Sequence, residues 1–150
     1  MKATMFQRIL VPVDFSDNAR AALALAVRIA AESAGELTIL NVVQSPQVFT
    51  ADVGIPEIAP VFVEVTEQLR AASERRMAEW VDEIVPEPMP RLLKVVQGRV
   101  VDEILREIES GHYDLVVMGA HGTRGLRGAL LGSTTNRVAR KSPVPVLVTH

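Results

Sequence analysis

The sequence predicts an α/β fold: a single doubly wound open sheet of five parallel strands in the order 3-2-1-4-5, with helices on both faces. Two observations carry this prediction. Short, continuous apolar runs alternate along the chain with longer segments whose apolar residues recur at helical spacing. The length of 150 residues, with no internal repeat or linker, matches one domain over residues 1–150. Such apolar runs are typical of parallel strands that are covered on both faces.

The first half of the chain contains two predicted strands and two predicted helices. Residues 8–14 (RILVPVD) form the first strand, and Pro12 belongs at its carboxyl end because proline cannot donate to the ladder. A helix follows, with Ser16 or Asp17 available as N-cap and Gly35 placed for its C-terminal turn. Residues 36–43 form the second strand. The prolines and glycine between residues 46 and 60 predict a long loop, and an amphipathic helix follows over residues 69–84.

The second half continues the alternation. Residues 91–97 form the third predicted strand, and a helix over residues 101–108 is closed by Gly111. Residues 114–119 form the fourth strand, residues 133–141 a short helix and residues 144–150 the fifth strand. In open sheets of this type, ligands bind outside the carboxyl ends of the strands, where the strand order reverses. We therefore expect Asp14 and Gly119 to open onto one crevice.

Composition narrows the class of protein. The chain has no cysteine, so disulfides and thiolate metal sites are excluded, and no apolar run approaches the ~20 residues of a membrane helix. The amino terminus lacks the features of a signal peptide, so we expect a cytoplasmic protein without membrane contact. Residues 115–150 contain five bases and no acid, although the net charge of the whole chain is −2. A basic region of this kind suits a small anionic ligand or a solvated surface.

A glycine-rich stretch lies in that basic region. Residues 119–134 (GAHGTRGLRGALLGST) hold five of the nine glycines of the chain. The stretch lacks both the lysine of a P-loop and the paired glycines of a dinucleotide fingerprint. What remains is Gly119, two residues, Gly122, nine residues, and then Gly132 and Ser133 at the start of a helix. Unpaired amides at a helix start attract phosphate, and glycine allows a close approach, although the same residues also suit a capped helix and tight turns.

With this spacing, the sequence resembles the universal stress protein family, and specifically its ATP-binding branch. The resemblance rests on VVMGAHG followed by GST, on ILVPVDFSDNA near the start and on SPVPVLV near the end, so it covers the whole chain. It implies the adenine nucleotide α-hydrolase-like fold, a role in stress response or signalling, and ATP as ligand, with Mg²⁺ or Mn²⁺ carried on the phosphates. No separate metal site is expected.

The resemblance also implies roles for individual residues. Asp14 becomes the ribose-contacting carboxylate, Val42 a main-chain contact for adenine, and Met118 the floor beside the nucleoside. Arg124 and Arg127 are candidates for clamping the phosphates or for a solvent-facing loop. The full set of candidate ligand-binding residues is Pro12, Val13, Asp14, Val42, Met118, Gly119, His121, Gly122, Arg124, Gly132, Ser133 and Thr134.

No complete catalytic constellation accompanies these residues. His121 is a candidate base for nucleotide hydrolysis, but a lone loop histidine more often orients a ligand or faces solvent. Turnover is therefore expected to be slow or absent, and no catalytic residue is assigned. An enzyme of the related ATP-pyrophosphatase or adenylyl-transferring class stays an alternative, although its S-G-G-x-D-S and H-I-G-H signatures are absent. An RNA-binding module is less favoured, because the GTRG loop at residues 122–125 follows a strand rather than joining two helices.

The fifth predicted strand lies at an edge of the sheet. Its sequence, VPVLVTH, is apolar and uncharged, which is typical of an edge that pairs with another strand. We expect a symmetric homodimer by antiparallel pairing of this strand, with Val144, Val146 and Val148 packing across the two-fold axis. The family resemblance implies the same assembly.

Overall fold

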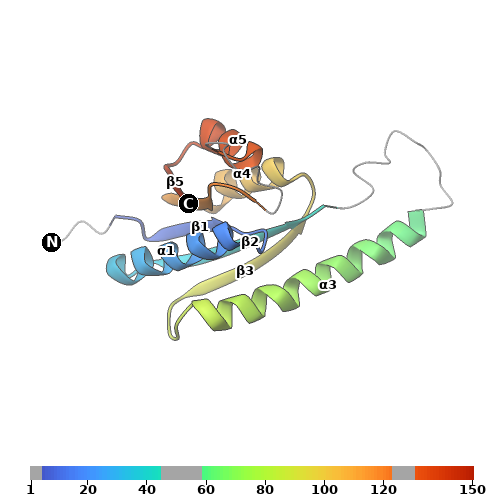
Figure 1. Ribbon diagram of the computed structural model, residues 1–150, viewed down its shortest axis with the longest axis horizontal. Helices are drawn as coiled ribbons and strands as arrows, with labels where there is room; N and C mark the ends of the chain where they lie inside the picture. Colours follow the sequence, from blue (N-terminus) through green and yellow to red (C-terminus); the bar gives the residue numbers. More distant parts are fainter. Residues whose placement is uncertain (1–4, 45–58, 123–130) are drawn as a thin grey trace.

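A parallel five-stranded sheet forms the centre of the protein in the computed structural model, which describes residues 5–44, 59–122 and 131–150 (Figure 1). The strands are β1 (Arg8–Pro12), β2 (Glu36–Val43), β3 (Arg91–Gln97), β4 (Leu115–Gly119) and β5 (Val146–Thr149). Their order is β3-β2-β1-β4-β5, and every neighbouring pair is parallel. The predicted fold and strand order are confirmed.

The four helices among the described residues cover the sheet in two layers. In Figure 1, α1 (Asp17–Ser33) and α3 (Ala59–Ile84) lie on one face, and α4 (Val100–Gly111) and α5 (Ser133–Lys141) lie on the other. Each face has its own apolar core. Ile9 and Val11 of β1 pack toward α1 and α3, whereas Leu10 between them packs toward α4 and α5. This alternation explains why the strands are continuously apolar, because both faces are buried.

The ends of the helices differ in detail from the prediction. Ser16 is the N-cap of α1, and its hydroxyl accepts a hydrogen bond from the amide of Ala19 at 3.2 Å. The left-handed residue that ends α1 is Ala34, with φ 53°, rather than Gly35. Gly35 is needed for another reason: a Cβ there would lie 2.9 Å from the carbonyl oxygen of Phe6. In the same way, α4 includes Gly111, and His112 adopts the left-handed conformation with φ 55°.

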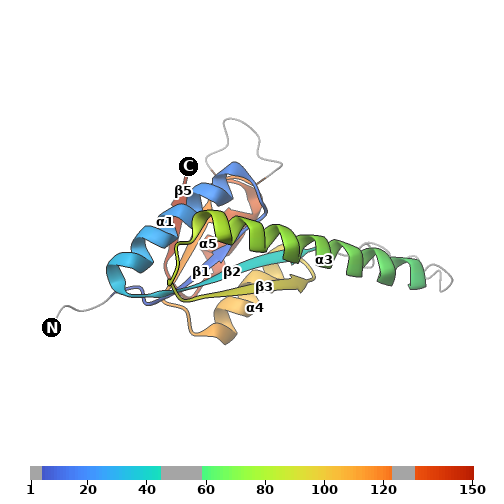
Figure 2. The ribbon, with the colours of Figure 1, turned by 90° about the horizontal axis from the view of Figure 1, so that it is seen from below.

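Helix α3 is much longer than predicted. It spans 26 residues and begins at Ala59, so Pro60 lies in its first turn instead of in a loop. Proline is tolerated there because the first amides of a helix have no partner within the helix. Both views show the N-terminal half of α3 extending beyond the end of the sheet (Figure 2). No described helix has the combination of length and apolar character that crossing a membrane would require.

Sheet topology creates the site. After β1 the chain crosses to α1 on one face, whereas α5, which follows β4 in the described part of the chain, covers the other face. The strands β1 and β4 are neighbours at the centre of the sheet, and the helices that follow them in the described chain cover opposite faces. Because these two connections leave the sheet toward opposite faces, a crevice opens between them, at the point where the strand order reverses.

Candidate functional site

A cavity of about 790 Å³ occupies this crevice, a volume within the usual range of small-molecule sites. Eleven of the twelve candidate residues predicted from the sequence line it, and Arg124, like Arg127, lies outside the described residues. The candidates that line the cavity are Pro12, Val13, Asp14, Val42, Met118, Gly119, His121, Gly122, Gly132, Ser133 and Thr134. The fold therefore brings together residues that are up to 122 positions apart in the sequence.

At the end of β1, Asp14 lies between two segments of the chain. Its Oδ1 atom accepts hydrogen bonds from the amide of Ser16 at 3.0 Å and from the hydroxyl of Ser16 at 2.5 Å. Its Oδ2 atom faces the loop after β4, because a Cβ on Gly122 would lie 2.5 Å away from that atom. The Oδ1 atom of Asp14 thus stabilises the turn into α1. The carboxylate group also lines the cavity. This position suits the binding of a ligand hydroxyl group.

At the end of β4, a chain of hydrogen bonds attaches the start of α5 to the sheet. The amide of Gly132 donates to the carbonyl of Ala120 at 2.7 Å, and the amide of Ala120 donates to the carbonyl of Thr149 at 2.7 Å. The buried hydroxyl of Thr135 donates to the carbonyl of Gly119 at 2.8 Å. The position of the helix start is therefore set by three hydrogen bonds that belong to the fold itself.

The first turn of α5 presents main-chain donors to the cavity. Gly132 is the N-cap residue, and no side chain caps the helix. The first bond within the helix runs from the amide of Asn136 to the carbonyl of Gly132, so the amides of Ser133, Thr134 and Thr135 have no acceptor in the part of the chain that the structure describes. The positive end of the helix dipole lies at the same place. Together these features favour an anion.

The glycines of the motif have more than one function. A Cβ on Gly119 would lie 2.7 Å from a main-chain carbon of Asn18, so this glycine permits α1 to pack against the end of β4. A Cβ on Gly132 would lie 3.2 Å from the carbonyl oxygen of Ala120. A larger side chain at position 132 would therefore press on the loop after β4 as well as on a ligand. Close packing within the protein explains Gly119 without any ligand.

His121 lines the cavity next to Gly122. Its Nδ1 atom is buried and has no hydrogen-bond partner among the described residues. Buried polar atoms normally have partners, so this nitrogen is available to a ligand in the crevice.

The cavity contains little charge. Asp14 is its one ionised side chain among the described lining residues. No group of three or more histidine or acidic side chains within the described ranges could hold a metal ion. A divalent cation would therefore rely mainly on phosphate oxygens and water for its ligands.

Several lining residues were not predicted from the sequence. Val100 and Ile104 of α4 form part of the apolar wall, and Asn41 of β2 and Thr135 of α5 add buried polar groups. The spacing of Val100 and Ile104 indicates only a core-facing stripe, which is the usual meaning of such spacing. Thr135 follows the motif by two positions, so its proximity to Ser133 was the one available signal.

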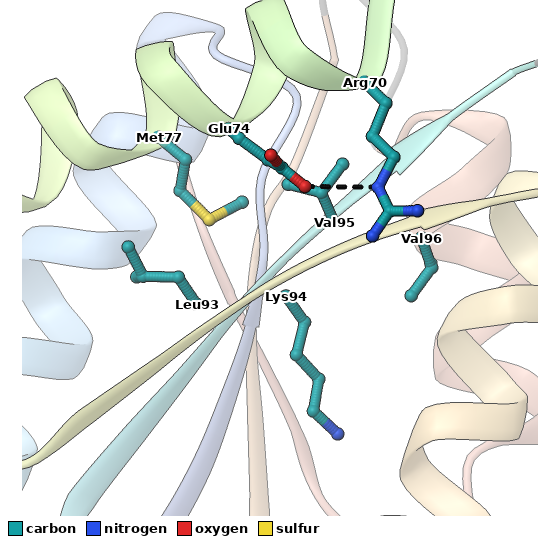
Figure 3. Close-up of a pocket in the computed structure, with 7 residues that line it drawn as sticks. All are labelled: Arg70, Glu74, Met77, Leu93, Lys94, Val95 and Val96. Carbon is teal, nitrogen blue, oxygen red and sulfur yellow. Dashed lines mark hydrogen bonds and ion pairs between the residues drawn. The ribbon is translucent and has the colours of Figure 1, made fainter. Parts of the chain in front are cut away.

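A second, smaller cavity of about 370 Å³ lies between α3 and the edge strand β3 (Figure 3). An ion pair between Arg70 and Glu74, 3.1 Å apart, borders it, and Met77 and Val95 contribute apolar surface. Lys94 points away from α3 in Figure 3 and instead pairs with Glu107 at 2.7 Å. Since this cavity contains no helix start and none of the predicted residues, the crevice at β1 and β4 is the candidate site.

Comparisons with known proteins agree with the fold and with the family resemblance. The model of the universal stress protein family matches residues 5–150. Universal stress protein YxiE of Bacillus subtilis is 29% identical to the chain, over 96% of this chain and 99% of the relative. Universal stress protein MJ0577 of Methanocaldococcus jannaschii is also 29% identical, over 97% and 96% of the two chains.

Solved structures show the same architecture. Universal stress protein UspA from Lactobacillus plantarum superposes with a TM-score of 0.83 at 30% identity, covering 97% of this chain and 99% of that one. A universal stress protein in complex with cAMP superposes with a TM-score of 0.64 at 26% identity, covering 97% and 98% of the two chains.

Proposed function

Because the chain belongs to the universal stress protein family, we propose that it is an ATP-binding member, acting in the cytoplasm as a homodimeric, nucleotide-dependent switch in a stress response. The observation that carries this proposal is the convergence of three elements on one cavity. The amides of α5 suit a polyphosphate, Asp14 suits ribose hydroxyl groups, and the main chain of Val42 suits the edge of adenine. The related structure with bound cAMP supports an adenine nucleotide as the class of ligand.

Each part of ATP has a matching part of the crevice. The triphosphate would lie at Gly132, Ser133 and Thr134, where main-chain amides lack acceptors. Mg²⁺ or Mn²⁺ would be held by phosphate oxygens and water. The nucleoside would lie over Met118, against the apolar wall that includes Val100 and Ile104. His121 would orient the phosphates rather than activate water, so ATP would act as a bound signal.

Calorimetric titration with ATP and Mg²⁺ tests this proposal. Ser133→Ala should weaken binding by roughly tenfold to a hundredfold, because it removes one charge-assisted hydrogen bond of about 1.5–3 kcal/mol. Ser142→Ala is the matched control, since Ser142 caps the opposite end of α5 and lies outside the cavity. It should bind ATP as the parent does.

Three results would count against the proposal. If the parent does not bind ATP, the assigned function is wrong. If Ser133→Ala binds as tightly as the parent, the phosphates lie elsewhere. Turnover faster than about 1 s⁻¹, at the lower end of ordinary enzymes, would identify the protein as an enzyme of the alternative nucleotide-hydrolysing class.

A further inference from the structure

A buried polar pair lies in the apolar layer between the sheet and α3. Asn41 of β2 is 8% exposed and Ser73 of α3 is 9% exposed. Leu37 and Ile39, which precede Asn41 on the same face of β2, belong to the apolar core, as does Met77 one turn after Ser73. Burying a polar pair in such a layer costs desolvation free energy, which its hydrogen bonds must offset. The partners in these hydrogen bonds therefore indicate the structural role of the pair.

The pair connects α3 to the end of β1. The Ser73 hydroxyl donates to Oδ1 of Asn41 at 2.5 Å, and Nδ2 of Asn41 donates to the carbonyl oxygen of Val13 at 2.8 Å. A carbonyl can only accept, so this bond assigns the amide orientation of Asn41. Val13 directly precedes Asp14 and lines the cavity.

The directions of the main-chain groups in β2 show which ladder hydrogen bond is replaced by the bond from Asn41 to the Val13 carbonyl. The amide of Leu37 donates to the carbonyl of Pro90, and the amide of Gly98 donates to the carbonyl of Val43, so the odd-numbered residues of β2 face β3. The amide of Val13 donates to the carbonyl of Leu40 at 2.8 Å, so the even-numbered residues face β1.

In a regular parallel ladder, the next bond would run from the amide of Val42 to the carbonyl of Val13. That bond is not formed, and the amide of Val42 has no acceptor among the described residues. The side chain of Asn41 occupies the Val13 carbonyl instead. The amide and carbonyl groups of Val42 are therefore directed past the end of β1, toward the cavity that Val42 lines.

We propose that Asn41, held by Ser73, is a positioning residue. Its side-chain amide donates to the Val13 carbonyl in place of the Val42 amide, and this keeps the main chain of Val42 available to a ligand. The inference rests on the proposed nucleotide function and specifies the base. The amide donor and the carbonyl acceptor of Val42 match adenine, which offers a ring nitrogen acceptor beside an amino donor. Guanine carries these groups in exchanged positions, with a carbonyl acceptor in place of the amino donor and a ring N–H donor in place of the acceptor. For a base held in one orientation, the site therefore favours ATP over GTP.

The double variant Asn41→Leu with Ser73→Ala tests this assignment. It replaces both polar partners with apolar groups and leaves neither of them unpaired, so the fold should survive. The Val13 carbonyl then lacks its donor and takes the amide of Val42, which extends the β1–β2 ladder by one bond. Thr66→Val is the matched control, because the buried hydroxyl of Thr66 donates to the carbonyl of Phe62 within α3 and bonds no other described residue.

The first readout is hydrogen exchange of the Val42 amide without nucleotide. We expect it to exchange rapidly in the parent and in Thr66→Val, and at least about tenfold more slowly in the double variant, where it is hydrogen-bonded. Equal exchange rates in the parent and the double variant would overturn the inference. This readout requires no ligand, so it separates the inference from the proposed function.

The second readout is the ratio of ATP affinity to GTP affinity. The double variant should lose roughly tenfold in this ratio, through loss of the base contact made by the Val42 amide, while its affinity for GTP stays close to that of the parent. An unchanged ratio in the double variant would overturn the inference even if the parent binds ATP. Absence of ATP binding by the parent would overturn the proposed function, and with it the assignment of adenine.

Discussion

At the scale of single residues, the one buried side-chain atom without a hydrogen-bond partner in the described part of the chain, Nδ1 of His121, lies at the crevice, and buried polar side chains elsewhere in that part are paired. Glu107 illustrates the first case. Burial alone would raise the pKa of its carboxyl group, but hydrogen bonds from Lys94 and Tyr113 and the charge of Lys94 hold that pKa below its ordinary value. Glu107 therefore contributes to stability at neutral pH, and this contribution is lost as the pH falls through its lowered pKa.

Tyr113 gives a direct test of this cluster. Burial and the hydrogen bond to Glu107 raise its pKa to about 12. Because the folded state favours the neutral phenol, the resulting stability is complete below the ordinary pKa near 10 and is lost as the pH rises toward 12. Tyr113 is the one tyrosine of the chain, so ultraviolet titration reports it alone.

We expect the parent to titrate near 12 and Glu107→Gln to titrate at lower pH, because the negative charge beside the phenol is removed. Arg106→Gln is a suitable control, since Arg106 is on the same helix but pairs with Glu103. A parent midpoint near 10 would contradict the arrangement of this cluster.

At the scale of elements, the sequence predicts strands better than helix limits. All five strands were identified because buried parallel strands are continuously apolar. The start of α3 was missed because Val61, Val63 and Val65 are spaced two apart and are exposed, so they give no helical period. The sequence predicts Pro60 within a loop for the same reason: no helical period follows it to mark the first turn of a helix.

The site was predictable where a motif or a strand end marks it. Asp14, Gly119 and Ser133 follow from topology and spacing, because parallel strands bring their carboxyl ends together. Asn41 could not be predicted, since a single polar residue within an apolar strand does not show which carbonyl it bonds. Its role depends on the register between β1 and β2, which only the folded structure supplies.

The attachment of α5 to β4 is an element-scale feature that mutation can test. Thr135→Val keeps the shape of the side chain but removes the hydrogen bond to the carbonyl of Gly119. We expect a loss of about 1–3 kcal/mol in the free energy of unfolding, because a polar group is left unpaired in a buried site. Urea denaturation measures this change.

Thr134→Val is the matched control, because the Thr134 hydroxyl makes no hydrogen bond to any described residue. Its free energy of unfolding should stay within about 0.5 kcal/mol of the parent value. If the two variants were equally stable, the Thr135 bond would not be what holds the start of α5 in place.

At the scale of the whole molecule, the direction of the main chain in β5 shows which groups lie at the outer edge of the sheet. The amide of Val116 donates to the carbonyl of Pro145, and the amide of Ala120 donates to the carbonyl of Thr149, so residues 145 and 149 face β4. Val146 and Val148 therefore direct their amides outward. Pro145 lacks a donor only on the side that faces β4, so it does not block the outer edge.

We expect a dimer formed by antiparallel pairing of β5 through Val146 and Val148. Val144 and Val146 also pack partly against the core beside α4 and α5, so the main chain supplies much of the contact. Val148→Pro removes an outward donor without removing a ladder bond to β4. Sedimentation at micromolar concentration should give twice the 16.3 kDa chain mass for the parent and the single mass for the variant. A monomeric parent would contradict this assembly.

The central claim is that an adenine nucleotide occupies the crevice between the ends of β1 and β4. A crystal structure of the protein grown with ATP and Mg²⁺ tests it most directly. The account predicts phosphates on the amides of Ser133 and Thr134, and adenine against the main chain of Val42. Nucleotide bound instead between α3 and β3, in the cavity beside Arg70, or a crevice without nucleotide at saturating ATP, would contradict it.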